Sequence, residues 1–418
     1  MSSFGDNDQM RIAQLSLHTS PVAPLGGRET GGMNVYVLEL SRELARAGHT
    51  IDIFTRRDED GPTIEVLEPG LSLIRLDVGP ATTLDKSDTA LLVPKMAREV
   101  ICFAATERLC YDLVHSHYWQ GGRAGTLISR MLGMPHVTMF HTLGEVKNRA
   151  RISEREPTFR IRHERLVARR ADAIVTTSHH ERGVLSRYYG ADEANMFTIP
   201  CGIDIELFYP RGKDASRKAL GLDPNYPLLL WVGRIEKLKG VDMLVDAIAE
   251  LDECAAKLVI VGGDDRTQSQ RRELEVQVAE AGLTDRVTFT GAVRHDQLPL
   301  YYSAADVVVV PSYYESFGLV AVEAMACGTP VVASRVGGLV STVIDGVTGY
   351  LIPWRCPGPF AEKLEVLIHN PELRANFGRV ARTSIERFRW ARVASEIARL
   401  YEQLIANRAD VAGEASHG

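Results

Sequence analysis

The sequence lacks the features that would place it in a membrane, in a secretory route or on nucleic acid. No run of 18 apolar residues occurs, so we expect no membrane-spanning helix. The first ten residues, MSSFGDNDQM, do not have the basic-then-apolar pattern of a signal peptide. A net charge of −6 and a pI of about 6.1 argue against nucleic acid as a partner. Together these absences predict a cytoplasmic protein.

Paired cysteines are also absent. The six cysteines are scattered and form no C-x-x-C pair, so we interpret them as reduced thiols and not as disulfides or zinc ligands. They are Cys102, Cys110, Cys201, Cys254, Cys327 and Cys356.

What is present is a long chain with two rounds of alternating strand and helix patterns. A length of 418 residues with 45% apolar content predicts two domains. Strand and helix patterns alternate from residue 10 onward and restart at residue 228, which predicts two doubly wound α/β halves. The expected limits are 10–203 and 204–385 for the domains, 386–406 for a final docking helix, and disorder at 1–9 and from residue 407.

The most informative stretch is PSYYESFGLVAVEAMACGTP, at residues 311–330. It follows an apolar run that reads as a buried parallel strand, and it opens a helical pattern. Glu315 therefore falls in the strand-to-helix turn and Glu323 within the helix. The backbone N–H groups of Ser316, Phe317, Gly318 and Leu319 should face an anionic or hydroxyl-rich ligand.

Other polar residues are expected at the same kind of sheet edge. In the first half, His18, the 115–118 cluster with Tyr118, and His141 with Thr142 each follow a predicted strand. Gly31-Gly32 lies at a strand–loop–helix junction, which suits a phosphate but also a plain tight turn. In the second half, Arg234 and Lys239 lie five residues apart on one loop, a pair suited to a diphosphate. The basic stretch 149–170 reads mostly as a solvated helix face, with a minority of arginines that could reach an anionic substrate.

Five strings in this sequence resemble a known enzyme family. They are TGGMNVYVLELSRELARAGHTIDIFTRR, DLVHSHYWQGG, FHTLGEVKN, VGRIEKLKG and ESFGLVAVEAMACGTP. They are similar to the retaining glycosyltransferases of the GT4 type, above all to the branch that transfers N-acetylglucosamine from a UDP donor to inositol 3-phosphate. The resemblance implies the GT-B fold, an α/β architecture in which two Rossmann-like doubly wound domains face across a cleft and a C-terminal helix crosses back to the first domain.

The resemblance also implies roles for individual residues. Glu315 would contact the transferred sugar, with His141 beside it, and Glu323 would hold the ribose. The remaining donor contacts would come from Gly32, Arg234, Lys239, Arg294, Ser316, Phe317, Gly318 and Leu319. The acceptor would be held by His18, Asn34, Lys86, Tyr118, Thr142 and Arg160, with Lys86 in a loop. The chain departs from the family pattern in the loop at 21–30 and in the alignment around Arg160, both on the acceptor side.

Cofactors, partners and rival functions follow from the same comparison. We expect no required cofactor or metal, because Arg234, Lys239 and helix dipoles can offset a leaving diphosphate, although some relatives bind magnesium near residues 302–305. The expected partners are a UDP-sugar (N-acetylglucosamine or glucose) and a small phosphorylated acceptor, and a homodimer is left open. One alternative is transfer to a hexose phosphate, as in sucrose-phosphate synthases. Others are a nucleotide-sugar epimerase and a sugar-nucleotide-binding protein without catalysis. A phosphorylase would need a lysine that carries pyridoxal phosphate, and no string in the sequence matches that site.

Overall fold

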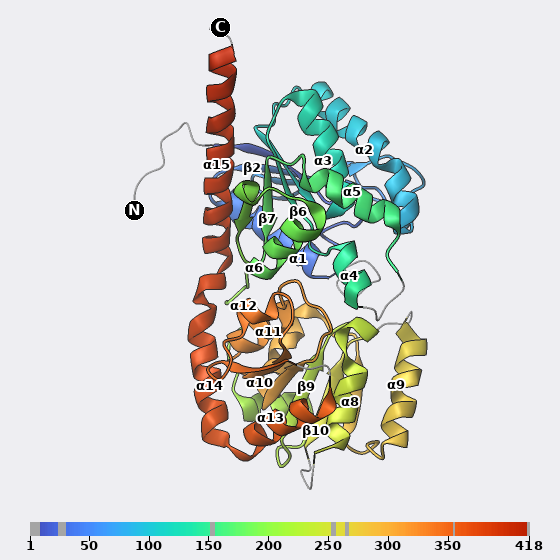
Figure 1. The fold of residues 1–418 in the computed structure, drawn as a ribbon, viewed down its shortest axis with the longest axis vertical. Coiled ribbons are helices and arrows are strands. Elements are labelled where there is room, and N and C mark those ends of the chain that lie inside the picture. Colours follow the sequence, from blue (N-terminus) through green and yellow to red (C-terminus); the bar gives the residue numbers. More distant parts are fainter. Residues whose placement is uncertain are drawn as a thin grey trace.

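The computed structural model describes residues 9–23, 31–150, 155–251, 256–263, 267–353 and 356–415. Two parallel sheets, each flanked by helices, lie one above the other, and the last two helices run along one side of both (Figure 1). The expected α/β architecture with two Rossmann-like halves is confirmed.

The first sheet has the strand order β3-β4-β2-β1-β5-β6-β7-β8. Its pairs are parallel except at one edge, where β3 runs antiparallel to β4. The apolar pattern of the sequence did not predict β3. The apolar strands β1, β5 and β6 are central and buried on both faces, as a doubly wound sheet requires. The bounds are β1 (Arg11–Leu15), β2 (Thr50–Arg56), β3 (Ile64–Glu68), β4 (Leu71–Leu76), β5 (Leu113–His117), β6 (His136–Met139), β7 (Ala173–Thr176) and β8 (Met196–Thr198).

The second sheet has the order β11-β10-β9-β12-β13-β14, with parallel pairs throughout. The central strand β12 is the run VVVV, fully buried, and it leads directly into the stretch that carries Glu315. The bounds are β9 (Leu228–Val232), β10 (Lys257–Val261), β11 (Val287–Gly291), β12 (Val307–Val310), β13 (Val331–Ser334) and β14 (Gly349–Ile352).

The helices follow the strands in the alternating order that the sequence predicts. In the first half they are α1 (Gly32–Arg46), α2 (Lys86–Thr106), α3 (Tyr118–Leu132), α4 (Gly144–Ala150), α5 (Thr158–Ala168) and α6 (His179–Val184). In the second half they are α7 (Lys213–Ala219), α8 (Val241–Ala249), α9 (Gln268–Glu280), α10 (Leu298–Ala304), α11 (Leu319–Ala326), α12 (Leu339–Thr342), α13 (Pro357–His369), α14 (Pro371–Ser384) and α15 (Trp390–Ala415).

Helix α3 begins six residues earlier than the sequence pattern indicated, because its first turns are rich in glycine. A Cβ on Gly121 would lie 2.9 Å from the carbonyl oxygen of Leu15, and one on Gly125 would lie 2.3 Å from the His136 ring. The glycines therefore let the helix pack directly onto β1 and β6. The apolar periodicity of the sequence alone predicts a helix over 124–132, and the start of that prediction was wrong, because Tyr118 is the first residue of α3.

Two other helices differ from their predicted limits. Lys86 is the first residue of α2 and not part of a loop, and the helix continues through Pro94. Helix α15 runs to Ala415, so the expectation of disorder from residue 407 was wrong. The disorder expected near the N-terminus and most of the divergent loop at 21–30 lie outside the described residues.

The C-terminal helix crosses back to the first half as predicted. Between α14 and α15, the carbonyl oxygen of Phe388 accepts a hydrogen bond of 2.7 Å from the Ile203 N–H. The Trp390 ring packs edge-on against Tyr36 of α1, with 5.6 Å between centroids. A Cβ on Gly202 would lie 2.1 Å from that Trp390 ring, so glycine is required for this close approach. The crossing joins both halves into one apolar core.

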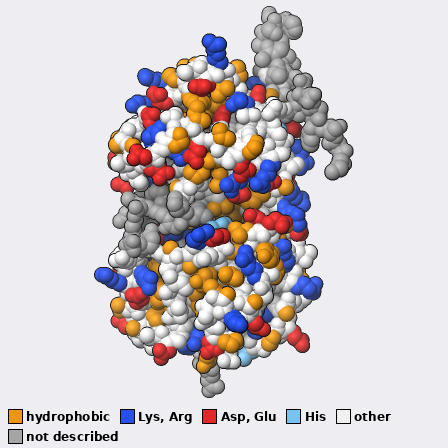
Figure 2. All heavy atoms as spheres, turned by 180° about the vertical axis from the view of Figure 1, so that it is seen from behind, with side chains coloured by type: hydrophobic (Ala, Val, Ile, Leu, Met, Phe, Trp, Pro, Cys, Tyr) orange, Lys and Arg blue, Asp and Glu red, His pale blue; other side chains and the backbone are white. Residues whose placement is uncertain are grey.

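The surface and the cysteines agree with the bulk properties. Acidic and basic side chains are interspersed on the face shown in Figure 2. The five described cysteines are free thiols, and Cys254 lies outside the described residues. Within the described ranges, none of the helices has the length and apolar content needed to traverse a bilayer.

Candidate active site

A cleft of about 780 Å³ lies between the two halves and receives side chains from both sheets. From the first half it is lined by the expected residues His18, Gly32, Asn34, Lys86, Tyr118, His141 and Thr142. From the second half it is lined by Arg234, Lys239, Glu315, Ser316, Phe317, Gly318 and Leu319. Most of the residues singled out by the sequence therefore converge on one cavity at the carboxyl edges of the two sheets.

Two helices begin at the centre of this cleft, one from each half. Helix α1 begins at Gly32, and a Cβ on Gly32 would lie 2.8 Å from Cδ1 of Leu319, the first residue of α11. Gly318 precedes α11 with φ of +93°, a conformation that favours glycine. The positive ends of two helix dipoles thus face the same space, where an anionic group would be stabilised from both sides.

The two cations of the second half lie on the same wall of the cleft. Lys239 Nζ is 2.6 Å from Glu315 Oε2, and Arg234 Nη1 is 2.9 Å from Glu236 Oε1. Lys239 therefore links the predicted diphosphate-binding pair to the predicted sugar-binding carboxylate. The arrangement places positive charge beside a carboxylate, as a diphosphate next to a hydroxyl-bearing sugar would require.

The loop that carries Glu315 is fixed by hydrogen bonds from both halves. The Gly338 N–H donates to the carbonyl oxygen of Glu315 at 2.9 Å. Thr177, directly after β7 in the first half, donates its hydroxyl hydrogen to the carbonyl oxygen of Ser316 at 3.0 Å. This second bond couples the position of the loop to the first sheet.

Glu323 and Arg294 do not line the main cleft. The Glu323 carboxylate accepts a hydrogen bond from Tyr302 Oη at 2.6 Å and lies 3.4 Å from His295 Nε2. It faces a neighbouring pocket of about 340 Å³ that Phe208 and His295 also line. The Arg294 side chain is 79% exposed and pairs with Asp296, and it is not among the residues that line either cavity.

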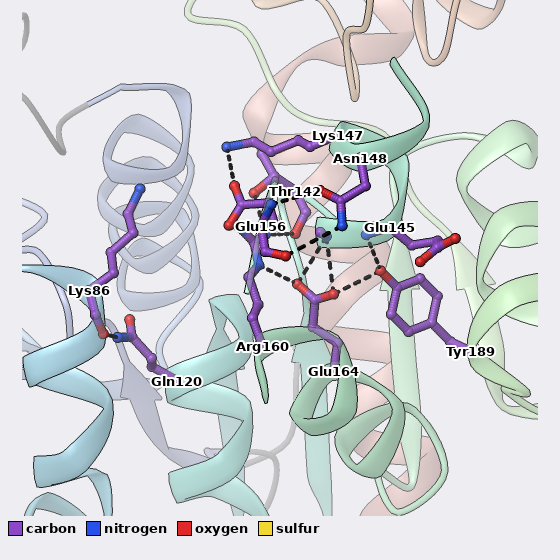
Figure 3. Close-up of polar contacts among 11 residues, drawn as sticks. Lys86, Gln120, Thr142, Glu145, Lys147, Asn148, Glu156, Arg160, Glu164 and Tyr189 are labelled. Carbon is purple, nitrogen blue, oxygen red and sulfur yellow. Dashed lines mark hydrogen bonds and ion pairs between the residues drawn. The ribbon is translucent and has the colours of Figure 1, made fainter. Parts of the chain in front are cut away.

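On the acceptor side, two cations lie near the Tyr118 ring. Lys86 Nζ is 5.9 Å from the ring centroid and the Arg160 guanidinium carbon is 4.9 Å from it. Arg160 Nη2 donates to the carbonyl and hydroxyl oxygens of Thr142 at 3.0 and 3.2 Å. Arg160 itself is only 2% exposed and is not among the residues that line the cleft. Figure 3 shows its guanidinium between the side chains of Glu156 and Glu164.

Asn34 serves first to hold its own loop. Its Oδ1 accepts a hydrogen bond from the Gly31 N–H at 3.2 Å, and its Nδ2 donates to the carbonyl oxygen of Ser20 at 2.6 Å. These bonds fix the entry to α1, so the amide orders the helix start that faces the cleft.

Tyr118 and His141 adopt left-handed backbone conformations at the ends of adjacent strands. Their φ angles are +64° and +59°, values that side-chain-bearing residues rarely adopt. At His141 the Thr142 N–H donates to the Phe140 carbonyl oxygen at 2.6 Å, which closes a γ-turn. Such strain is concentrated at functional sites, and here it directs both side chains into the cavity.

A chain of hydrogen bonds behind His141 fixes its tautomer. Gln14 Oε1 lies 2.6 Å from His117 Nε2, and His117 Nδ1 lies 3.0 Å from His141 Nε2. Because an amide oxygen can only accept, His117 carries its proton on Nε2, and His141 must then donate from Nε2. The Nδ1 atom of His141 is therefore an acceptor.

The imidazoles at the cleft are neutral. Burial lowers the pKa of His141 to about 3. Burial, together with Lys86, His141 and Arg160, holds the pKa of His18 well below its ordinary value. Both rings can therefore accept hydrogen bonds from hydroxyl groups at neutral pH, and neither supplies a positive charge.

Sequence reasoning missed Lys147 and Gln14, and it named His117 only as a member of the 115–118 cluster, without a role. Lys147 lines the cleft beside Thr142, and its only signal was a place in the string FHTLGEVKN. Gln14 and His117 are fully buried, and nothing in their spacing indicated that they contact each other. In the part of the chain that the structure describes, no group of three or more His, Cys, Asp or Glu side chains could hold a metal ion, and the expectation that no metal is required stays a prediction.

Comparisons with known proteins agree with this geometry. "Glycosyltransferase Family 4" matches residues 30–207 and "Glycosyl transferases group 1" matches residues 212–384. A D-inositol 3-phosphate glycosyltransferase of Xylanimonas cellulosilytica is 40% identical over 95% of this chain and 98% of its own. A protein of the same name with the suffix 2, from Catenulispora acidiphila, is 41% identical over 94% and 95%. The solved structure of sucrose-phosphate synthase from Thermosynechococcus elongatus is similar with a TM-score of 0.88 and 37% identity, over 96% of this chain and all of the other.

The fold, the cleft and the placement of its residues define a glycosyltransferase with the GT-B architecture. The chain belongs to glycosyltransferase family 4. It is an enzyme that transfers a hexosyl group, as the resemblance of the five strings implied.

Proposed function

We propose that this enzyme transfers N-acetylglucosamine or glucose from a UDP-sugar to a phosphorylated polyol, with inositol 3-phosphate as the preferred acceptor. The observation that carries the proposal is the cationic acceptor wall. Lys86 and Lys147 line the cleft around Tyr118 and Thr142, with Arg160 directly behind them. Lys147 and Arg160 share the carboxylate of Glu156, and Asp85 and Asp88 also line the cleft, so this wall carries charges of both signs. Three cations around one aromatic ring can still hold a phosphate by charge-assisted hydrogen bonds, which a neutral sugar does not need. The names of the 40% identical relatives support the same acceptor.

The donor would bind against the second half. Arg234, Lys239 and the starts of α1 and α11 would hold the diphosphate, and Glu323 would hold the ribose hydroxyls. These contacts stabilise negative charge as it develops on the leaving UDP, so we propose that no cofactor or metal is required. A cytoplasmic location and a homodimer remain predictions.

The reaction would retain the configuration of the donor sugar. The acceptor hydroxyl attacks the anomeric carbon from the face that UDP leaves, the bond to the phosphate oxygen breaks, and that oxygen takes the hydroxyl proton. Glu315 would orient the sugar through its hydroxyls, and His141 Nδ1 would accept a hydrogen bond from one of them. No covalent sugar–enzyme intermediate is needed.

A second candidate is transfer to a hexose phosphate, favoured by the similarity to sucrose-phosphate synthase. Both candidates predict use of a phosphorylated acceptor, and an epimerase or a binding protein does not. UDP release should be measured with UDP-N-acetylglucosamine and UDP-glucose, each with inositol 3-phosphate, fructose 6-phosphate or no acceptor. Release with inositol 3-phosphate supports the proposal, release with fructose 6-phosphate alone supports the second candidate, and UDP release that does not depend on an acceptor overturns both.

A further inference from the structure

Two glutamates contact the buried guanidinium of Arg160, and they differ in how they are held (Figure 3). Glu164 is 0% exposed, and its carboxylate accepts from Arg160 Nε at 2.7 Å, from Tyr189 Oη at 2.8 Å and from the Gly144 N–H at 3.0 Å. Glu164 thus has partners on both oxygens and orients the arginine from within the fold.

Glu156 contacts the same guanidinium and also Lys147, a residue that lines the cleft. Its Oε2 lies 2.9 Å from Arg160 Nη1, and its Oε1 lies 3.0 Å from Lys147 Nζ. Its side chain is 19% exposed, so the carboxylate can reach water without unfolding the site. Burial alone would raise the pKa of Glu156, but Arg160 and Lys147 outweigh burial and hold that pKa below its ordinary value.

The backbone of Glu156 is anchored independently of its carboxylate. Asn148 Oδ1 accepts from the Glu156 N–H at 2.7 Å, and Asn148 Nδ2 donates to the Glu156 carbonyl oxygen at 3.4 Å. The side chain can therefore rotate away from the two cations while the chain around it stays in place.

We infer that Glu156 occupies, on Lys147 and Arg160, the position that the acceptor's phosphate takes, and that it is a specificity-determining residue. The inference rests on the proposed phosphorylated acceptor. A phosphate dianion carries about twice the charge of a carboxylate and an additional acceptor oxygen, so it displaces Glu156 where a neutral polyol does not. The displaced carboxylate moves into solvent, and the cations exchange one anion for a stronger one.

The test compares Glu156→Gln with Glu145→Gln. The Glu156→Gln change keeps the side-chain size and the backbone contacts with Asn148, and it removes only the charge. Glu145 lies close by on α4, pairs with Arg149 at 2.9 Å and points away from Lys147. The Glu145→Gln variant therefore removes the same charge as Glu156→Gln without touching the contacts of Lys147 and Arg160. Inorganic phosphate binding to the intact enzyme is measured by calorimetry, and acceptor and donor KM values are measured for transfer to inositol 3-phosphate.

Glu156→Gln should tighten phosphate binding and lower the acceptor KM by about three- to tenfold, the range expected for one partly exposed charge-assisted contact. The donor KM should not change, and Glu145→Gln should match wild type. Unchanged or weaker phosphate binding in Glu156→Gln overturns the inference, as does an equal gain in both variants, which would reflect net charge alone. If neither wild type nor Glu156→Gln binds inorganic phosphate, the inference about Glu156 is also overturned. The proposed function is decided separately, by whether the enzyme transfers a sugar to inositol 3-phosphate.

Discussion

The hydroxyl of Tyr401 lies 2.6 Å from Nδ1 of His115, although 286 residues separate them in the sequence. Tyr401 belongs to α15, the helix that crosses back, and it is fully buried. The His115 ring packs against His117 with 4.4 Å between centroids, and His117 contacts His141. The C-terminal helix therefore supports the histidine that faces the cleft.

Tyr401→Phe should lower both stability and turnover. The change leaves His115 Nδ1 without its partner in a buried site, which costs about 1–3 kcal/mol. Because the support of His141 is loosened, kcat should fall more than the acceptor or donor KM changes. Urea unfolding and steady-state kinetics measure both, with Tyr209→Phe as a control because Tyr209 is 43% exposed. A loss of stability with unchanged kcat would show that Tyr401 acts on the fold alone.

Removing the donor-side cations should weaken use of the UDP-sugar. Lys239→Ala and Arg234→Ala each lose a charge-assisted contact worth about 1.5–3 kcal/mol, or roughly ten- to a hundredfold in kcat/KM for the donor. Lys237→Ala is the matched control, because Lys237 is exposed and is not among the residues lining the cleft. Wild-type rates of both variants at low UDP-sugar would show that the diphosphate binds elsewhere.

The buried histidines make the fold sensitive to acid. Burial lowers the pKa of His136 and of His141 to about 3, whereas unfolded histidine titrates near 6.5. Below pH 6.5 the unfolded chain therefore binds protons that the folded chain does not. Each histidine then costs roughly 2 kcal/mol of stability by pH 5. Burial raises the pKa of Glu164 and Glu181, so near their own pKa values these two groups oppose the loss.

The midpoint of thermal unfolding, measured at pH 7, 6 and 5, checks this prediction. It should fall with each step. A midpoint that is the same at pH 7 and pH 5 would show that these two rings are not held neutral in the folded protein.

The product should keep the α configuration of the donor sugar. The prediction follows from front-face attack, in which the acceptor oxygen approaches from the side that the diphosphate leaves. Proton NMR of fresh product distinguishes the anomers by the coupling of the anomeric proton. A β-linked product would contradict the retaining mechanism and leave the assignment of the donor site untouched.

Local strings predicted which residues line the centre of the cleft, and the roles of these residues stay predictions. The sequence predicted Gly32, Arg234, Lys239 and Glu315, because a strand-to-helix turn is formed by a few residues that are adjacent in the sequence. The long-range contacts could not be predicted in this way. Tyr401 contacts His115 only because α15 crosses between the halves. The start of α3 could not be predicted, because glycines at a helix start resemble a loop unless the strands that they pack against are known.

The acceptor side shows the same limit of local patterns. Thr142 was predicted from its place after a strand, and it lies at the cleft. Arg160 was also expected to contact the acceptor, but its guanidinium is enclosed by Glu156, Glu164 and Thr142. Which charges are neutralised depends on the packing of α4 against α5, and that packing has no signature in the sequence.

The most direct test of the account is the initial rate of transfer to inositol 3-phosphate compared with free inositol, in wild type and in Lys86→Ala. Lys95→Ala is the control, since Lys95 is exposed on the same helix. The account predicts that wild type and Lys95→Ala prefer the phosphorylated acceptor by at least about tenfold, as charge-assisted contacts to phosphate imply. Lys86→Ala should raise the acceptor KM much more than the donor KM. Equal rates of transfer to inositol 3-phosphate and free inositol by the wild-type enzyme would contradict the phosphate-binding acceptor site.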